Sequence, residues 1–158
     1  MGRSRGGFST KLHLQVDGQG LPLAVEVTPG QQHESTCFES VVQAVRIAQP
    51  QGRPRWRPKR LAGDKGYSYP RIRVWLRKHG IEAVIPQRDD QRANHRGRPL
   101  KFNRAVYRQR NVVERCVGWL KENRRVATRY EKLAINYLGM LKLAMIKRYL
   151  AVEFPNRA

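Results

Sequence analysis

The chain is poor in cysteine, in acidic residues and in long apolar stretches. Its two cysteines, Cys37 and Cys116, lie far apart and outside any metal-type spacing, so neither a disulfide framework nor a zinc site is expected. No stretch reaches the roughly 18 apolar residues that a membrane-spanning helix needs. The first residues, MGRSRGGFSTKLHL, include cations but not the apolar core of a secretory signal. These absences predict a protein of the reducing cytoplasm without a membrane partner.

Positive charge is what the sequence has in excess. It contains 32 Lys and Arg against 12 Asp and Glu, a net charge of +20 over 158 residues. Arginine dominates, and its planar guanidinium suits bidentate contact with phosphate. Such a balance predicts a polyanionic partner, DNA or RNA, and hence a nucleoid-associated location. On charge alone a structural RNA binder of the ribosomal kind stays open. The length predicts one domain, and the 40% hydrophobic content is sufficient for a core.

Hydrophobic periodicity predicts an α/β fold. Apolar residues alternate through 12–16 and 21–27 around the turn sequence Asp17-Gly18-Gln19-Gly20, which predicts a β-hairpin. On this interpretation His13 lies on the exposed face of the hairpin. Helices are predicted over about 40–48, 71–79 and 133–150, with short strands ending in LAG and over 81–86. Two strands, a helix, a strand, a helix and a strand in this order indicate a mixed sheet, with the hairpin beside crossover-connected strands.

A helix predicted over 107–125 carries the spacing Tyr-x2-Arg-x3-Glu-x6-Lys, formed by Tyr107, Arg110, Glu114 and Lys121. At about 100° per residue these four side chains would share a stripe roughly 60° wide on one continuous helix. The opposite side is apolar and predicts burial for Val112, Val113, Cys116, Trp119 and Leu120. A carboxylate among cations is what metal-assisted phosphoryl transfer on nucleic acid needs. The alternative is an ordinary solvated face.

Asp64 stands where the predicted LAG strand ends, and Lys65-Gly66-Tyr67 follows it. Ligands gather at the carboxyl ends of strands in open α/β sheets, so Asp64 is a candidate metal ligand. The alternative is that it caps the next helix, although Ser68 is the better cap and Pro70 suits the first turn. Asp64 and Glu114 together could hold Mg²⁺ or Mn²⁺ with phosphate oxygens.

Cations around these acids are candidate contacts to DNA phosphates. Lys65, Arg110 and Lys121 would clamp the phosphate. The polar, aperiodic segment 87–104 is interpreted as a basic loop that orders on nucleic acid, with a solvated linker as the alternative; its candidate DNA-binding residues are Arg88, Arg92, Arg96, Arg98 and Lys101. Three further residues have weaker interpretations. His33 and Glu34 could approach the site from a loop, and Trp56 could either stack on a base or pack internally.

Four segments carry a resemblance over nearly the whole chain: GRSRGGFSTKLHLQVDGQGLPLAVEVTPGQQHE, LAGDKGY, the Tyr-x2-Arg-x3-Glu-x6-Lys helix and RRVATRYEKLAINYL. The chain resembles bacterial insertion-sequence transposases of the type-four and type-five groups. The resemblance implies an RNase H-like fold with an Asp-Asp-Glu triad. It also implies Mg²⁺-dependent cleavage at transposon ends and strand transfer into double-stranded target DNA. By position, Asp64 matches the second Asp and Glu114 the final Glu, while Tyr107, Arg110 and Lys121 match residues that contact transposon-end DNA.

The chain departs from this family at its start. The first Asp of the family lies on a strand upstream of SRGG, so we expect residues 1–150 to form a partial catalytic domain that lacks its first strand, with 151–158 as a tail. Two origins are consistent with this expectation: a frame read by frameshifting, whose partner is an upstream-frame polypeptide, or a truncated relic. The family reaction joins two ends and implies a dimer on DNA. A catalytically dead, basic DNA-binding module is the alternative function.

Overall fold

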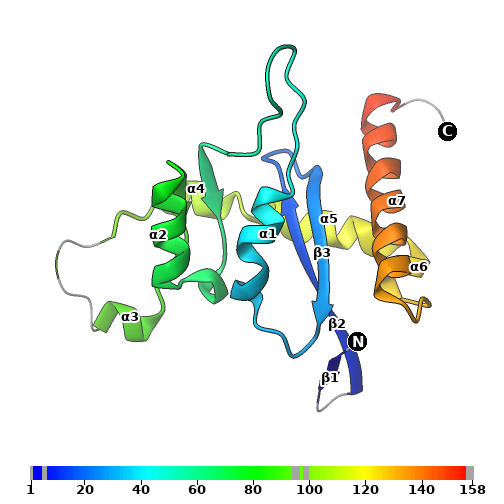
Figure 1. The fold of residues 1–158 in the computed structure, drawn as a ribbon, viewed down its shortest axis with the longest axis horizontal. Helices are drawn as coiled ribbons and strands as arrows, with labels where there is room; N and C mark the ends of the chain where they lie inside the picture. The colour runs from blue at the N-terminus through cyan, green and yellow to red at the C-terminus, as the bar shows by residue number, and fades with distance from the viewer. Residues whose placement is uncertain (1, 5–6, 94–96, 98–99, 156–158) are drawn as a thin grey trace. The chain divides into compact units, whose positions relative to one another are not determined.

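The computed structural model describes residues 2–4, 7–93, 97 and 100–155. Its contacts divide the chain into two compact units. Figure 1 labels the helices and strands that belong to them. The first, here the hairpin unit, comprises Met1–Gln32 and Asn111–Ala158, and the second, the central unit, comprises His33–Arg110. Each unit is described by itself below.

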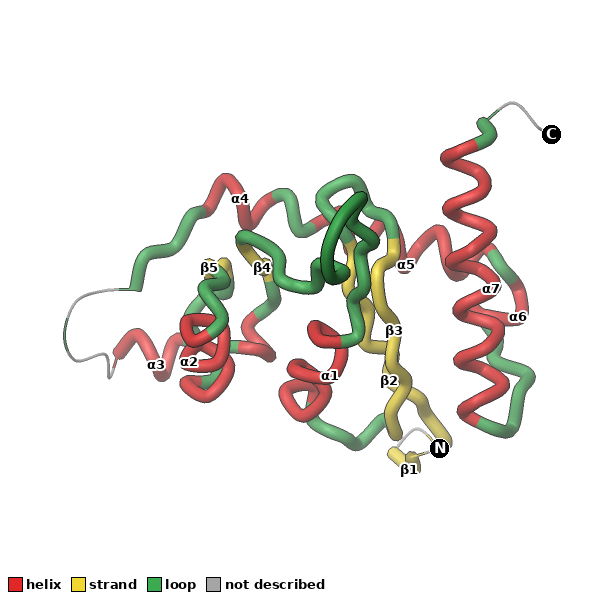
Figure 2. Tube along the Cα trace, turned by 45° about the horizontal axis from the view of Figure 1, so that its top comes forward, coloured by secondary structure: helices red, strands yellow, loops and turns green. Residues whose placement is uncertain are grey.

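The strands of the hairpin unit form a three-stranded antiparallel sheet in the order β1-β2-β3 (Figure 2). β1 is Gly2–Ser4, β2 is Gly7–Val16 and β3 is Pro22–Pro29. Leu12 pairs with Val27 and Leu14 with Val25, so the alternating apolar residues of both strands share a face. In the turn, the Asp17 carboxylate accepts hydrogen bonds from the backbone N–H groups of Gln19 and Leu21 at 2.9 and 2.8 Å. The predicted hairpin is confirmed.

Three helices complete the hairpin unit: α5 (Asn111–Glu122), α6 (Arg124–Ala127) and α7 (Ala134–Glu153). Their buried side chains form a cluster that packs against the apolar face of β2 and β3; its members are Cys116, Leu120, Val126, Tyr137, Leu141 and Ala144. The Tyr137 hydroxyl donates to the Val126 carbonyl oxygen at 2.9 Å and so fastens α7 to α6. The apolar side predicted for the α5 sequence is therefore its packed face. No helix of the described residues is long and apolar enough to cross a membrane.

The central unit is built around a parallel strand pair, β4 (Arg60–Ala62) and β5 (Glu82–Val84), with Leu61 opposite Ala83. Around it lie η1 (Glu34–Cys37), α1 (Phe38–Gln43), η2 (Lys65–Tyr67), α2 (Pro70–Lys78), α3 (Asp89–Ala93) and α4 (Arg104–Arg108). Its core is a second cluster, formed by Phe38, Val42, Ile72, Leu76, Ile81 and Ile85. Trp56 packs at its edge, with its ring centroid 6.0 Å from that of Trp75 and 5.4 Å from that of His79 in tilted and edge-to-face contacts, which supports a packing role.

The helix predicted over 107–125 is not continuous. α4 ends at Arg108 and α5 begins at Asn111, and the connecting Arg110 N–H donates to the Tyr107 carbonyl oxygen at 3.0 Å in a tight turn. The residues from 108 to 111 are all polar, so no apolar contact holds them in a helix. The single stripe predicted for the four signature residues is therefore wrong. Glu114 and Lys121 still share one face of α5, because seven residues amount to nearly two turns.

Two other predictions need correction. His13 is not exposed: 3% of its surface is accessible, and its Nε2 lies 2.8 Å from Thr28 Oγ1. The helix predicted over 40–48 ends at Gln43, because Ile47 instead pairs with Arg55 in an antiparallel bridge. The mixed α/β class is confirmed, but the hydrogen bonds of the described strands form two small sheets rather than one. The helices predicted over 71–79 and 133–150 are confirmed with small shifts of their ends.

Candidate metal and phosphate site

Asp64 follows β4 and begins the η2 turn. It is the N-cap of η2, and its Oδ1 accepts a hydrogen bond from the Gly66 N–H at 2.9 Å. The capping interpretation is thus correct for η2 but not for α2, whose N-cap is Tyr69. The predicted Ser68 cap is wrong, whereas Pro70 does occupy the first turn. One Asp64 oxygen caps the turn, and a carboxylate has further lone pairs with which it can bind a cation.

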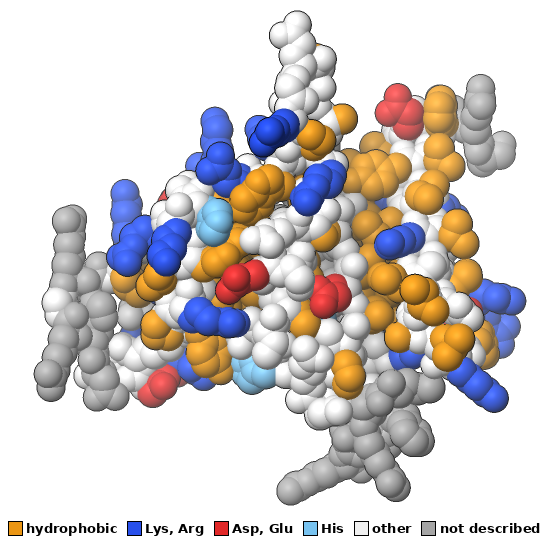
Figure 3. Space-filling view, viewed as in Figure 1, with side chains coloured by type: hydrophobic (Ala, Val, Ile, Leu, Met, Phe, Trp, Pro, Cys, Tyr) orange, Lys and Arg blue, Asp and Glu red, His pale blue; other side chains and the backbone are white. Residues whose placement is uncertain are grey.

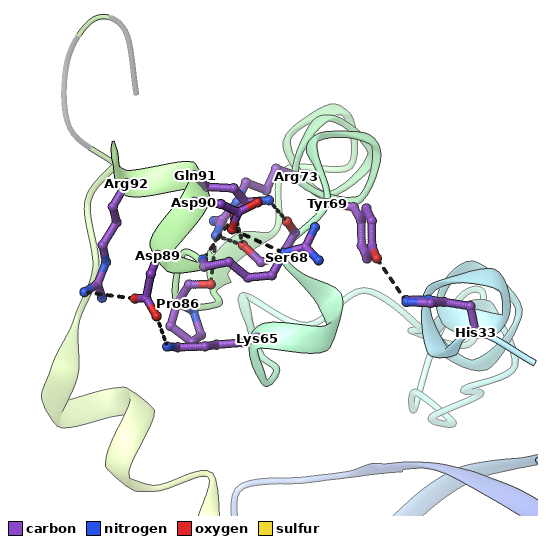
Figure 4. Close-up of polar contacts among 11 residues, drawn as sticks. His33, Lys65, Ser68, Tyr69, Arg73, Pro86, Asp89, Asp90, Gln91 and Arg92 are labelled. Atoms are coloured by element: carbon purple, nitrogen blue, oxygen red, sulfur yellow. Dashed lines mark hydrogen bonds and ion pairs between the residues drawn. The ribbon is translucent and has the colours of Figure 1, made fainter. Parts of the chain in front are cut away.

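A buried network fixes the chain after the Asp64 turn. The fully buried Ser68 hydroxyl donates to Gln91 Oε1 at 2.7 Å and accepts from the Arg73 guanidinium at 3.1 Å. The same Arg73 nitrogen donates to the Ile85 carbonyl oxygen at 2.8 Å, and burial lowers the pKa of Arg73 from its usual value. Figure 4 shows that Ser68, Arg73 and Gln91 point toward one another. α2, the end of β5 and α3 are thereby joined beside Asp64.

Beside this turn is a cavity of about 410 Å³ that holds both cations and acids; it is lined by His33, Lys65, Gly66, Tyr69, Arg88, Asp89 and Asp90. Lys65 Nζ lies 3.4 Å from Asp89 Oδ2, with the two side chains 52% and 81% exposed. The Arg88 guanidinium stacks 4.7 Å above the Tyr69 ring, and its Nε lies 4.0 Å from Asp90 Oδ1. Exposed ion pairs of this kind contribute little stability, so the two cations can exchange a carboxylate for a phosphate.

The carboxylates here also act on Tyr67. Burial is the largest cause that raises the pKa of the Tyr67 hydroxyl, and the charges of Asp64 and Glu34 raise it further. Both acids therefore lie close to the same phenol. The sequence interpretation that Glu34 could approach the site from a loop agrees with this closeness, since a Cβ atom at Gly66 would lie within 3.0 Å of oxygens of both Glu34 and Asp64. The acids Asp89 and Asp90 were missed, although two adjacent acids inside a basic segment were a visible signal.

The other predicted site residues lie elsewhere in the two units. Glu114 is exposed on α5 of the hairpin unit, with Lys121 on the same helix. Tyr107 and Arg110 belong to the central unit, where the Arg110 guanidinium lies 5.6 Å from the Tyr107 ring centroid. Asp64 and Glu114 thus fall in different units. Among the described residues, no group of three or more His, Cys, Asp or Glu side chains could hold a metal ion.

The described cations of segment 87–104 have mixed surroundings. Arg92 lies 4.0 Å from Asp89, and both Arg92 and Lys101 line a second cavity of about 300 Å³ with Phe102 and Arg104. Arg96 and Arg98 lie outside the described residues. On the face drawn in Figure 3, Lys and Arg side chains are much more numerous than Asp and Glu. That excess agrees with the charge of the whole sequence and suits a polyanion.

A mixed α/β fold with a carboxylate at a strand end, set among many cations, defines a basic α/β protein with a candidate phosphate-binding site. Residues 2–146 match the family model described as a transposase DDE domain, and the chain therefore belongs to the DDE transposase family. The resemblance inferred from the sequence motifs is confirmed at this level.

Two relatives are insertion-sequence proteins. One, from Burkholderia cepacia, is named as a candidate transposase for insertion sequence element IS402 and is 33% identical over 135 residues, which cover 85% of this chain and 59% of that protein. The other, from Brucella ovis, is named as a candidate transposase for element IS6501 and is 28% identical over 142 residues, 87% of this chain and 95% of that protein. The chain thus spans about three fifths of the Burkholderia relative. No solved structure gave a significant match.

Proposed function

We propose that the chain is the catalytic-domain portion of an insertion-sequence transposase that cleaves DNA at transposon ends and transfers the strand into target DNA. The observation that carries this proposal is Asp64, which follows the parallel strand β4 beside a cavity lined partly by Lys65 and Arg88, in a chain of the DDE family. A relation to the RNase H-like fold and action as a dimer on two DNA ends belong to the same proposal.

Asp64 and Glu114 are the proposed ligands for Mg²⁺ or Mn²⁺. Carboxylate oxygens are the donors that these ions prefer, and Mg²⁺ is typically held by one or two carboxylates together with substrate phosphates. The donor set therefore fits, provided that the two acids come together on DNA. When bound, such ions activate the attacking water or 3′-hydroxyl and stabilise the leaving oxygen.

The cations have a separate role, which is to hold the DNA backbone. Lys65 and Arg88 line the cavity next to the Asp64 turn and would bind the phosphates nearest to the reaction. Lys121 lies on the same face of α5 as Glu114 and would bind phosphates near that acid. The remaining proposed contacts to DNA are Tyr107, Arg110, Arg92, Arg96, Arg98 and Lys101.

The test is cleavage of a labelled oligonucleotide that carries the terminal repeat of the parent element. The chain is assayed alone and together with the polypeptide encoded immediately upstream, with Mg²⁺ or Mn²⁺. Metal-dependent nicking or joining should disappear in Asp64→Asn and in Glu114→Gln, because each substitution removes an ionised ligand. Asp17→Asn is the matched control, since Asp17 caps the hairpin turn. Activity that persists at full rate in Asp64→Asn would refute the catalytic assignment.

A binding module without catalysis is the second candidate. It is favoured by the net charge of +20 and by the absence, among the described residues, of a complete group of metal ligands. It predicts DNA binding whose log affinity falls with log salt by about 0.9 per phosphate contact. It also predicts no metal-dependent cleavage in either mixture, which distinguishes it from the transposase proposal.

A further inference from the structure

Glu34, the first residue of η1, is held close to the Asp64 turn by its neighbours. His33 Nε2 lies 3.0 Å from the Tyr69 hydroxyl, and the two rings meet edge to face at 5.2 Å (Figure 4). The Arg71 guanidinium donates to the Ser35 carbonyl oxygen at 2.7 Å. The residues on both sides of Glu34 are therefore fastened to the start of α2.

Gly66 shows how near the two carboxylates are. A Cβ atom at this position would lie 2.6 Å from Glu34 Oε2 and 3.0 Å from Asp64 Oδ1. Both oxygens thus converge on the same small space, which is open because residue 66 has no side chain. Mg²⁺ binds oxygen at about 2.0–2.1 Å, so small rotations of the two side chains would bring both oxygens to one ion.

The charges around this space favour a cation. The oxygens of Asp64 and Glu34 both lie within about 3 Å of one position beside Gly66, and a cation between them would relieve the repulsion of two negative carboxylates. The Lys65 ammonium next in the chain lies 3.4 Å from Asp89 Oδ2. Gly66 also lines the 410 Å³ cavity with Lys65 and Arg88, which leaves room for a DNA phosphate next to the carboxylates. Two neighbouring carboxylates beside a space large enough for a phosphate are surroundings in which a divalent ion removes like-charge repulsion.

We propose that Glu34 is a further metal ligand, which holds Mg²⁺ or Mn²⁺ together with Asp64 and a DNA phosphate. A side chain at position 66 would displace the Glu34 carboxylate. This inference rests on the proposed function, since Asp64 is a metal ligand in both, but it adds an acid from η1 that lies in the same unit as Asp64.

The test is a titration of the full-length chain with Mn²⁺, in which electron paramagnetic resonance measures the free ion. Glu34→Gln keeps the size of the side chain and removes its charge, and the dissociation constant for Mn²⁺ should rise at least about tenfold. Glu34→Asp, which retains a carboxylate, should recover part of the affinity. Glu39→Gln is the matched control, because Glu39 is a nearby acid paired with Arg71 at 4.0 Å, and it should bind within about twofold of the wild type.

Gly66→Ala provides a second check that keeps both acids in the sequence. Its Cβ would crowd the Glu34 oxygen more closely than the Asp64 oxygen, so it should weaken Mn²⁺ binding, and the double variant with Glu34→Gln should lose less affinity than the sum of the two single losses. Circular dichroism verifies folding, and if Glu34→Gln does not fold, Glu34→Asp and Gly66→Ala decide the question. Wild-type affinity in a folded Glu34 variant, with affinity lost in Asp64→Asn, would refute the role of Glu34 and leave the proposed function intact. Wild-type affinity in Asp64→Asn would instead refute the proposed function.

Discussion

Ser68→Ala should destabilise the central unit by about 1–3 kcal/mol, because it removes two buried hydrogen bonds worth roughly 0.5–1.5 kcal/mol each. These are the 2.7 Å bond to Gln91 and the 3.1 Å bond from Arg73. Neither partner is left without a bond: Gln91 Oε1 still accepts from the Arg88 N–H at 3.3 Å, and Arg73 still donates to the Ile85 carbonyl oxygen. The loss in the free energy of unfolding should therefore be smaller than the loss caused by leaving a buried charge without any partner.

Urea denaturation followed by tryptophan fluorescence measures this loss. A Trp119→Phe background leaves Trp56 and Trp75 as reporters, and both belong to the central unit. Ser40→Ala is the matched control, since Ser40 is exposed and makes a local bond to the Cys37 carbonyl oxygen at 3.0 Å. The control should change the free energy of unfolding by less than about 0.5 kcal/mol. A Ser68→Ala variant as stable as this control would refute the role assigned to the network.

Two further predictions concern the hairpin unit. Thr28→Val removes the hydroxyl that lies 2.8 Å from the buried His13 ring, and should lower the free energy of unfolding by about 1–3 kcal/mol; a change near zero in urea denaturation would argue against a buried His13. Burial is the largest cause that raises the pKa of the Cys116 thiol, so the folded state holds its proton after the unfolded chain has lost it. The stability that this pKa difference contributes is fully present below about pH 8.5, the usual pKa of a thiol. It is lost as the pH rises through the pKa of Cys116 in the folded state. Between pH 7 and 10 the wild type should therefore lose more stability than Cys116→Ala, and equal losses would contradict the assignment.

Patterns in short stretches of sequence predicted the helices and strands whose formation depends on residues close together in the chain. The alternating residues and the Asp17 turn determined the hairpin, and the 3.6-residue period determined α2 and α7. The polar face of the hairpin could not be predicted, because alternation reports side-chain direction and not whether a face is covered. His13 looks like a surface residue in sequence, yet its bond to Thr28 makes burial acceptable.

The sequence predicted an acid beside cations as the candidate site, and it missed the neighbouring acids Asp89 and Asp90. Asp64 stood out because a carboxylate at a strand end followed by a glycine turn is a local signal. The continuous helix over 107–125 was wrong because helical spacing does not require the intervening residues to be helical, and the polar turn at Gln109–Arg110 breaks it. Glu34 had only a weak interpretation from sequence, because it is brought to Asp64 by contacts between residues more than 30 positions apart, such as His33 with Tyr69.

The central claim is that Asp64 and Glu114 bind the same metal centre when the chain is on DNA. Replacing Mg²⁺ by Fe²⁺, with ascorbate and peroxide, cuts the polypeptide backbone close to the bound ion. On transposon-end DNA, the account predicts cuts next to both residue 64 and residue 114, which excess Mg²⁺ and Asp64→Asn should both suppress. Cuts near residue 64 that are never accompanied by cuts near residue 114 would contradict it.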